Sequence, residues 1–344
     1  MKKYIITVLL IAILSLSAAQ GMAQGANPVK IGALSMLNLS EKEYAAIAES
    51  RLLAYNYLMD QDVIQESASV LANMPAFEIV YFDTLDAMVM ALQSSSILMF
   101  FAPQTTAEYL CANNDALFMP YTIDYEKADR LVYQDLIRRS GSGYSFMMLE
   151  NQTELRDQFN EAITAMEQDG TLETLQQKYI SDVISGAEIE AIAFEKFDGD
   201  PIRIAVTGSL PPMDYVAPDG SFAGFNTALL SEIGKRLERN IELVQVDSLG
   251  RSAALASGTV DVVFWTQTTP FSGMSAEERM ANAAERTAER AENYTEEEQT
   301  LWQMITEKRG ISREADANQD MPEGTIVTKQ YFQDAIIYVM MKAD

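Results

Sequence analysis

Residues 202–215 read IRIAVTGSLPPMDY, and together with PDG (218–220), GFN (224–226) and AALASGTVD (253–261) they decide the fold of this 344-residue chain. The apolar run 202–206 predicts a buried strand, and the proline pair Pro211 and Pro212 fixes an extended loop at its carboxyl end. Open α/β sheets bind ligands at that end of their strands. The stretch therefore predicts an α/β unit with a crevice beside the proline pair.

The order of these elements resembles the first lobe of the family 3 solute-binding proteins, the periplasmic receptors of polar amino-acid ABC importers. That family runs from a strand through a Pro-Pro-aromatic turn, an Asp-Gly hairpin and a Gly-Phe-Asp helix start to Leu-x-x-Gly-x-x-Asp before a strand. Two residues depart from the pattern, because Met213 replaces the aromatic after the prolines and Asn226 replaces the Asp. The resemblance implies a two-lobe fold that closes on a small solute.

Segments on either side of this stretch resemble other parts of the same family, but in a different order. Residues 144–172 resemble the closing segment, residues 29–115 the second lobe, and residues 324–341 the strand that normally leaves the first lobe. This order predicts an α/β fold of the two-lobe periplasmic-binding-protein type (type II) that is circularly permuted. The alternative is a tandem pair of incomplete domains.

The expected boundaries follow from this order. A second-lobe-like α/β domain is expected at 29–140 and a first-lobe-like domain at 141–344, with an acidic connector at 185–200 that would join the ancestral ends. Residues 271–321 form a Glu- and Met-rich helical insertion that the family does not need there. It is either a solvated helical hairpin packed on the lobe or a lid or docking surface for a membrane partner.

Apolar runs and amphipathic periodicity predict the individual elements. Strands are expected at 29–34, 77–82, 97–101, 144–149, 202–206, 241–246, 260–265 and 326–341. Helices are expected at 41–58, 84–93, 105–112, 154–168, 172–180, 226–237, 251–256 and 275–309.

Residues 1–23 carry the features of a signal peptide. Lys2 and Lys3 precede an apolar core at 4–16, and small residues at 21–23 offer a cleavage site. The core is shorter than the roughly 20 apolar residues that a membrane span needs. Because no cysteine follows it, no lipoprotein attachment site is present, and a periplasmic protein with a cleaved signal peptide is expected.

Composition excludes several classes of function. The chain has 50 acidic and 25 basic residues, a formal charge of -25, so nucleic acid is not expected as a partner. Histidine is absent, which removes Ser-His and Cys-His nucleophiles and every His-containing metal site. The single cysteine, Cys111, cannot form an internal disulfide and is expected to be a buried inert thiol. No catalytic residue, cofactor or metal is predicted.

The resemblance implies several ligand-binding residues around the crevice. Leu210 stands where the family places an aromatic before the proline pair, and Leu210 and Met213 would form pocket wall beside Ser209. Thr266 and Thr268 match the two hydroxyl residues that bind the ligand after the Gly-x-x-Asp strand.

Other candidates have a second interpretation. Tyr215 contacts ligand or packs in the hairpin, and Trp265 is a ligand platform or a core residue. The family's Arg after the hydroxyl residues is missing, so Arg251 either replaces that cation or is a surface residue at a helix start. Where the second lobe usually carries an Asp for the ammonium group, the chain offers Gln104 and two threonines. A standard α-amino acid would therefore lack both charged anchors.

Three functions follow from these observations. The first is a monomeric periplasmic binding protein that captures a small polar solute, an amino acid or a related compound, for an ABC transporter permease. The second is a sensor or interaction protein that reports ligand to a membrane receptor through the insertion. The third is an enzyme related to cyclohexadienyl dehydratases, which would need an acid in the crevice, where the loops offer Asp214.

Overall fold

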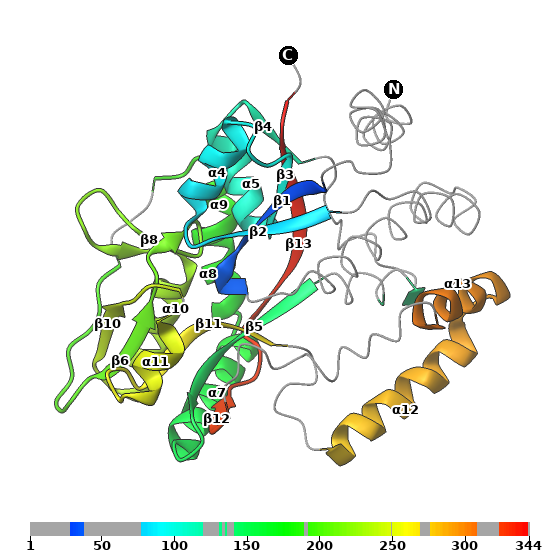
Figure 1. The fold of residues 1–344 in the computed structure, drawn as a ribbon. Coiled ribbons are helices and arrows are strands. Elements are labelled where there is room, and N and C mark those ends of the chain that lie inside the picture. The colour runs from blue at the N-terminus through cyan, green and yellow to red at the C-terminus, as the bar shows by residue number, and fades with distance from the viewer. Residues whose placement is uncertain are drawn as a thin grey trace.

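The computed structural model describes residues 28–37, 77–119, 131–132, 135, 141–188, 192–248, 250–268, 276–307 and 323–342. The expected signal peptide at 1–23 and the expected helix at 41–58 lie outside the described residues. In the described part of the chain, ten strands form one sheet in the order β10-β6-β11-β5-β13-β3-β1-β2, with β12 added beside β5 and β4 beside β13 (Figure 1).

The N-half of the sheet is built from the first strands of the chain. Apolar runs form the parallel strands β1 (Val29–Leu34), β2 (Phe77–Phe82) and β3 (Met99–Pro103). Helix α4 (Leu85–Gln93) begins where the Thr84 hydroxyl accepts the Ala87 amide, an N-cap. Helix α5 (Gln104–Asn113) follows β3 directly, and β4 (Leu117–Phe118) comes after it.

The C-half repeats this arrangement with later residues. Its parallel strands are β6 (Ile202–Val206), β10 (Ile241–Gln245) and β11 (Val262–Thr268), and β12 (Thr325–Val327) lies beyond β5. A small second sheet holds β7 (Ser209–Leu210), β8 (Asp214–Val216) and β9 (Phe222–Ala223). The helices are α7 (Thr153–Gln168), α8 (Thr171–Gln176), the π-helical turn η3 (Gln177–Ser181), α9 (Asp182–Ile184), α10 (Phe225–Leu237) and α11 (Arg251–Ala256).

Two long strands join the halves. β5 (Gly141–Leu149) pairs antiparallel with β11, and β13 (Phe332–Met341) pairs antiparallel with β3. The two strands pair with each other between residues 141–144 and 332–335. Figure 1 shows β13, in red, running out of the C-half into the N-half. The expected α/β fold with two lobes is confirmed.

The two halves share one strand order. The order is β2-β1-β3-β13 in the N-half and β10-β6-β11-β5 in the C-half. In both, the last strand is the antiparallel crossing strand. Each crossing strand then pairs with one more short antiparallel strand, β4 or β12. A core of apolar side chains extends through both halves, with stacked rings of Phe146 and Tyr331 (centroids 4.5 Å apart) near the crossing.

The described part of the insertion forms two helices, α12 (Ala276–Asn293) and α13 (Glu296–Glu307). Asp135, only 2% exposed, accepts hydrogen bonds from Arg286 (3.0 Å), Arg290 (2.7 Å) and the Tyr294 hydroxyl (2.6 Å). The Arg290 guanidinium also lies 4.4 Å from the Trp302 ring centroid. The helices are therefore attached to Asp135.

The expected connector at 185–200 contains no helix or strand in its described part, 185–188 and 192–200. It is held on the C-half by the Asn240 amide, which bonds the main chain of Phe197 and Gly199. The domain boundaries themselves stay a prediction.

Candidate functional site

Arg251 connects the two halves. It begins α11, is 3% exposed, and donates from Nε to the Ser248 carbonyl (3.1 Å) within the C-half. Its Nη2 donates to the carbonyl of Met36 in the N-half at 3.0 Å. Met36 lies in the turn η1 (Ser35–Leu37), directly after β1. The interpretation of Arg251 as a surface residue is therefore wrong, because its guanidinium is buried between the halves.

The proline-pair loop is pinned onto the start of α10. The Pro212 carbonyl accepts the Phe225 amide (3.1 Å) and the Met213 carbonyl accepts the Asn226 amide (2.9 Å). Gly224 has φ +104°, and an added Cβ would lie 2.6 Å from both carbonyl oxygens, so only glycine fits there. This close approach turns the loop inward.

Two predicted pocket-wall residues lie in the core as a result. Leu210 and Met213 are both 0% exposed and belong to the main apolar cluster, and neither lines a cavity described below. Ser209 is half-buried on β7, opposite Tyr215 of β8.

Asp214 is a fully buried carboxylate behind this loop. Its Oδ2 accepts hydrogen bonds from the Thr207 amide and hydroxyl and the Gly208 amide, at 2.6–3.0 Å, whereas Oδ1 has no hydrogen-bond partner among the described residues. Burial raises the pKa of Asp214 to about 6, and the hydrogen bonds and the charge of Arg251 lower it only in part. The sequence had already singled out this acid.

The hydroxyl residues of β11 divide into two groups. The Thr268 hydroxyl bonds Ser145 (3.0 Å) and accepts from the Gln330 amide (3.2 Å), so it ties β11 to β5 and to the segment before β13. The Thr266 hydroxyl is buried and has no hydrogen-bond partner among the described residues. The side chain of Trp265 lies outside the described residues, and its role stays a prediction.

Tyr215 is half-buried on β8. Burial raises the pKa of its phenol, and Tyr109 of α5 and Tyr179 of η3 raise it further. Its hydroxyl is buried without a hydrogen-bond partner in the described part of the chain. Tyr215 thus lies near side chains of both halves.

A cavity of about 410 Å³ lies between the halves. Its walls come from α5 of the N-half, from the end of α8 and η3, which pack on α10, from α9, which packs on η3 and α5, and from the start of β13. The lining residues are Gln104, Thr105, Glu108, Gln176, Ile180, Ser181, Ile184, Phe332, Gln333 and Asp334. Small-molecule sites fall in this size range and combine apolar walls with a few polar groups. Of the predicted ligand residues, Gln104 lines this cavity.

Two carboxylates in this cavity escaped the sequence prediction. Asp334 is 3% exposed, and its Oδ2 accepts from the amide (3.1 Å) and hydroxyl (2.7 Å) of Thr105. Burial raises the pKa of Asp334 to about 7. Burial also raises the pKa of Glu108, whose Oε1 accepts from the Gln104 amide at 2.9 Å. Asp334 directly precedes the apolar run 335–341, and this position of an acid beside a predicted buried strand could have identified it from the sequence.

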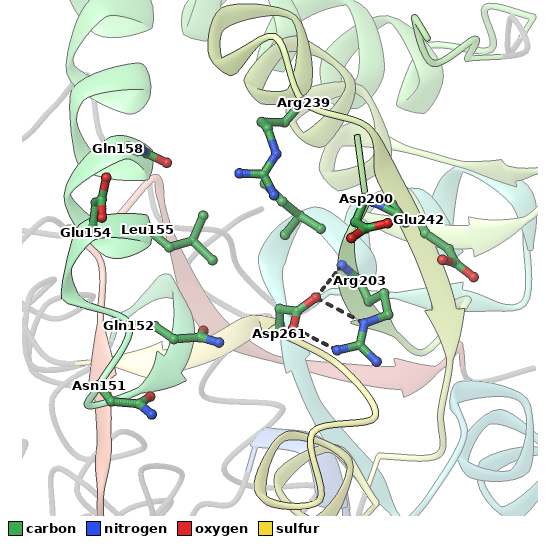
Figure 2. Close-up of a pocket in the computed structure, with 12 residues that line it drawn as sticks. Asn151, Gln152, Glu154, Leu155, Gln158, Asp200, Arg203, Arg239, Glu242 and Asp261 are labelled. Carbon is green, nitrogen blue, oxygen red and sulfur yellow. Dashed lines mark hydrogen bonds and ion pairs between the residues drawn. The ribbon is translucent and has the colours of Figure 1, made fainter. Parts of the chain in front are cut away.

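A second cavity, of about 760 Å³, lies at the opposite end of the C-half. Figure 2 shows Arg239 extending into it, with the ion pair of Arg203 and Asp261 on one wall and Leu155 of α7 on another. It opens at the amino ends of β6 and β11, whereas open α/β sheets bind ligands at the carboxyl ends. The inter-half cavity is therefore the better candidate for a ligand site.

Other kinds of site find no support in the described residues. No group of three or more His, Cys, Asp or Glu among them is placed to hold a metal ion. None of their helices combines the length and the apolar character of a membrane span. Burial raises the pKa of the Cys111 thiol to about 11, which fits the expected inert thiol.

The family model of the bacterial extracellular solute-binding proteins, family 3, matches residues 202–270. This segment extends from β6 to just past β11 and includes the proline-pair loop, α10 and α11. The match covers about a fifth of the chain and names no solute. No curated protein matches the chain.

Several solved structures resemble the chain at low similarity. A ligand-binding component of an ABC-type import system from Staphylococcus aureus, with zinc bound, is 10% identical (TM-score 0.35) over 92% of this chain and 66% of that one. The alkanesulfonate-binding protein SsuA from Xanthomonas axonopodis pv. citri is 13% identical (TM-score 0.29) over 71% and 56%. A phosphate-binding protein from Streptococcus pneumoniae is 11% identical (TM-score 0.34) over 92% and 90%. The chain thus spans less than two thirds of the first two structures, and scores this low carry no functional argument.

Proposed function

We propose that this protein is a periplasmic solute-binding protein that captures a small polar solute between its halves and delivers it to the permease of an ABC importer. The observation that carries the proposal is the cavity between α5 of the N-half and the end of α8 with η3, which pack on α10 of the C-half. The family-model match over residues 202–270 supports the same class. The proposal includes a monomer with a cleaved signal peptide, and it assigns no enzymatic step.

The mechanism follows from the way the halves are joined. Only β5 and β13 cross between the halves in the described part of the chain, so a small twist of these strands would open the cavity. Solute would contact Gln104 on one side and Ile180 and Ser181 of η3 on the other only in the closed form. Binding energy that exists only when the halves are closed shifts the population toward that form.

Circular permutation belongs to the same proposal. The shared strand order of the halves supports it, and so does β13, which carries residues 332–341 into a half otherwise built from residues 29–118. A tandem pair of incomplete domains would leave each half continuous in sequence. Because Gly32 pairs with Phe100 and Phe100 with Val339, the backbones of β1 and β13 should lie two strand spacings apart, about 10 Å. Distance labels at the exposed Lys30 and Lys342 should therefore report close residues, and widely separated labels would refute the permutation.

A screen for solutes tests the function. The mature chain is heated with amino acids, amines, purines, peptides, aromatic acids and polyols, and a solute at about 100 times its Kd should add about 2.7 kcal/mol to the free energy of unfolding. Each hit is then tested for closure with fluorescent labels at Asp86 on α4 and Glu238 after α10, in a Cys111→Ser background. A solute that stabilises the protein and shortens this distance is the expected result. Absence of any such solute across all six classes would overturn the proposal.

A further inference from the structure

The inter-half cavity has an unbalanced charge. Among the described residues that line it, Glu108 and Asp334 are acidic, and none is basic. They come from α5 and β13, on neighbouring walls. Burial is the main cause of the raised pKa of Asp334, and the charge of Glu108 raises it slightly further.

The hydrogen bonds within the cavity leave this charge uncompensated. Asp334 accepts only from uncharged donors, namely Thr105 and the amide of Ala335, and Glu108 accepts from the amide of Gln104. Neutral donors orient a carboxylate but do not neutralise it. Without a counter-charge, burial favours the protonated form of Asp334, and a bound cation would favour the ionised form. The remaining walls are amides, a hydroxyl and apolar side chains, among them Phe332, Ile180 and Ile184.

We propose that this cavity binds a small organic cation, a solute with a protonated amine and no carboxylate, and that Glu108 and Asp334 are its charged contacts. The inference rests on the proposed function and names the chemical class of its solute. The ammonium group would donate to both carboxylates, and the carbon chain would lie along Phe332, Ile180 and Ile184.

A carboxylate-bearing solute fits the cavity less well. It would bring a further negative charge against Glu108 and Asp334, and none of the described lining residues carries a positive charge. Arg251, the buried arginine between the halves, does not line this cavity, and its guanidinium bonds the main-chain carbonyls of Met36, Ser248 and Phe264. The described lining therefore favours amines over amino acids.

Three probes of equal chain length test the charge preference. Calorimetric titrations of the mature chain use 1,4-diaminobutane, 1,4-butanediol and succinate, which carry two positive charges, none and two negative charges. The expected result is binding of the diamine alone. Choline and ethanolamine serve as further cationic probes of different length, because the proposed site could bind a cation and still be too short or too long for 1,4-diaminobutane.

Variants separate the site from general attraction to an acidic protein. Glu108→Gln and Asp334→Asn should each weaken amine binding at least tenfold, whereas Glu173→Gln, which removes an exposed acid on the nearby α8, should leave it unchanged. Circular dichroism checks that each variant is folded. If Asp334→Asn does not fold, the amine affinity of Glu108→Gln alone tests the site. Equal weakening by all three substitutions, or none by Glu108→Gln, would refute the site.

The outcome also separates this inference from the proposed function. If a neutral or anionic solute closes the halves and no amine binds, the cation site is refuted and the binding protein stands. If no solute of any class closes the halves, both fail together.

Discussion

Replacing Arg251 with methionine should open the protein without unfolding it. Methionine keeps much of the buried volume but removes the hydrogen bond from Nη2 to the Met36 carbonyl, which joins the halves. A hydrogen bond from a charged donor contributes about 1.5–3 kcal/mol. Since every 1.4 kcal/mol is a factor of ten, the ratio of closed to open molecules should fall by about 10-fold to about 150-fold.

Single-molecule fluorescence with labels at residues 86 and 238 measures this ratio directly. The matched control is Arg236→Met, which removes hydrogen bonds to Glu232, Asp169 and Thr171, all within the C-half. Both variants should lose stability toward urea, but only Arg251→Met should lengthen the distance between the labels. An unchanged closed fraction in Arg251→Met would refute the idea that this residue holds the halves together.

Three further predictions concern stability. Burial raises the pKa of Asp334 to about 7, above its unfolded value near 4, so between these pH values the folded state binds a proton that the unfolded state does not. The resulting stability is complete below about pH 4 and is lost as the pH rises through 7. Urea unfolding measured across this pH range should therefore show a flatter stability profile for Asp334→Asn than for the natural chain. Gly224→Ala should cost at least about 1–3 kcal/mol, measured by urea unfolding, because a Cβ would meet two carbonyl oxygens; a loss below 0.5 kcal/mol, roughly the scatter of harmless substitutions, would contradict this. Asp135→Ala should leave Arg286 and Arg290 without their carboxylate and speed amide hydrogen exchange in α12, and unchanged exchange there would contradict the attachment.

Most elements could be predicted because their signals are local. β1, β2, β6 and α11 begin and end at the predicted residues, since apolar runs and helix starts are written in consecutive positions. The predicted strand at 326–341 is instead two strands, β12 and β13. Between them the Lys329 amide bonds the Asn160 side chain and the Gln330 amide bonds Thr268, which draws the chain out of the ladder.

The candidate site was harder to predict because its groups meet only in three dimensions. Thr105 and Asp334 are 229 positions apart in sequence, and their contact depends on β13 crossing into the N-half. Leu210 and Met213 were predicted as pocket wall from their place beside the prolines. They lie in the core because Gly224 lets the loop approach α10 closely, a distance that residue types alone do not give.

The crossing of β13 also affects the order in which the two halves can fold during synthesis. The ribosome completes β3 at Pro103, but its antiparallel neighbour β13 begins only at Phe332. Until then β3 presents Phe100 and Phe101, both later buried, along an edge that has no partner strand. We therefore expect the nascent chain to need a chaperone until β13 is synthesised, and the N-half to become resistant to proteases only after β13 has paired with β3.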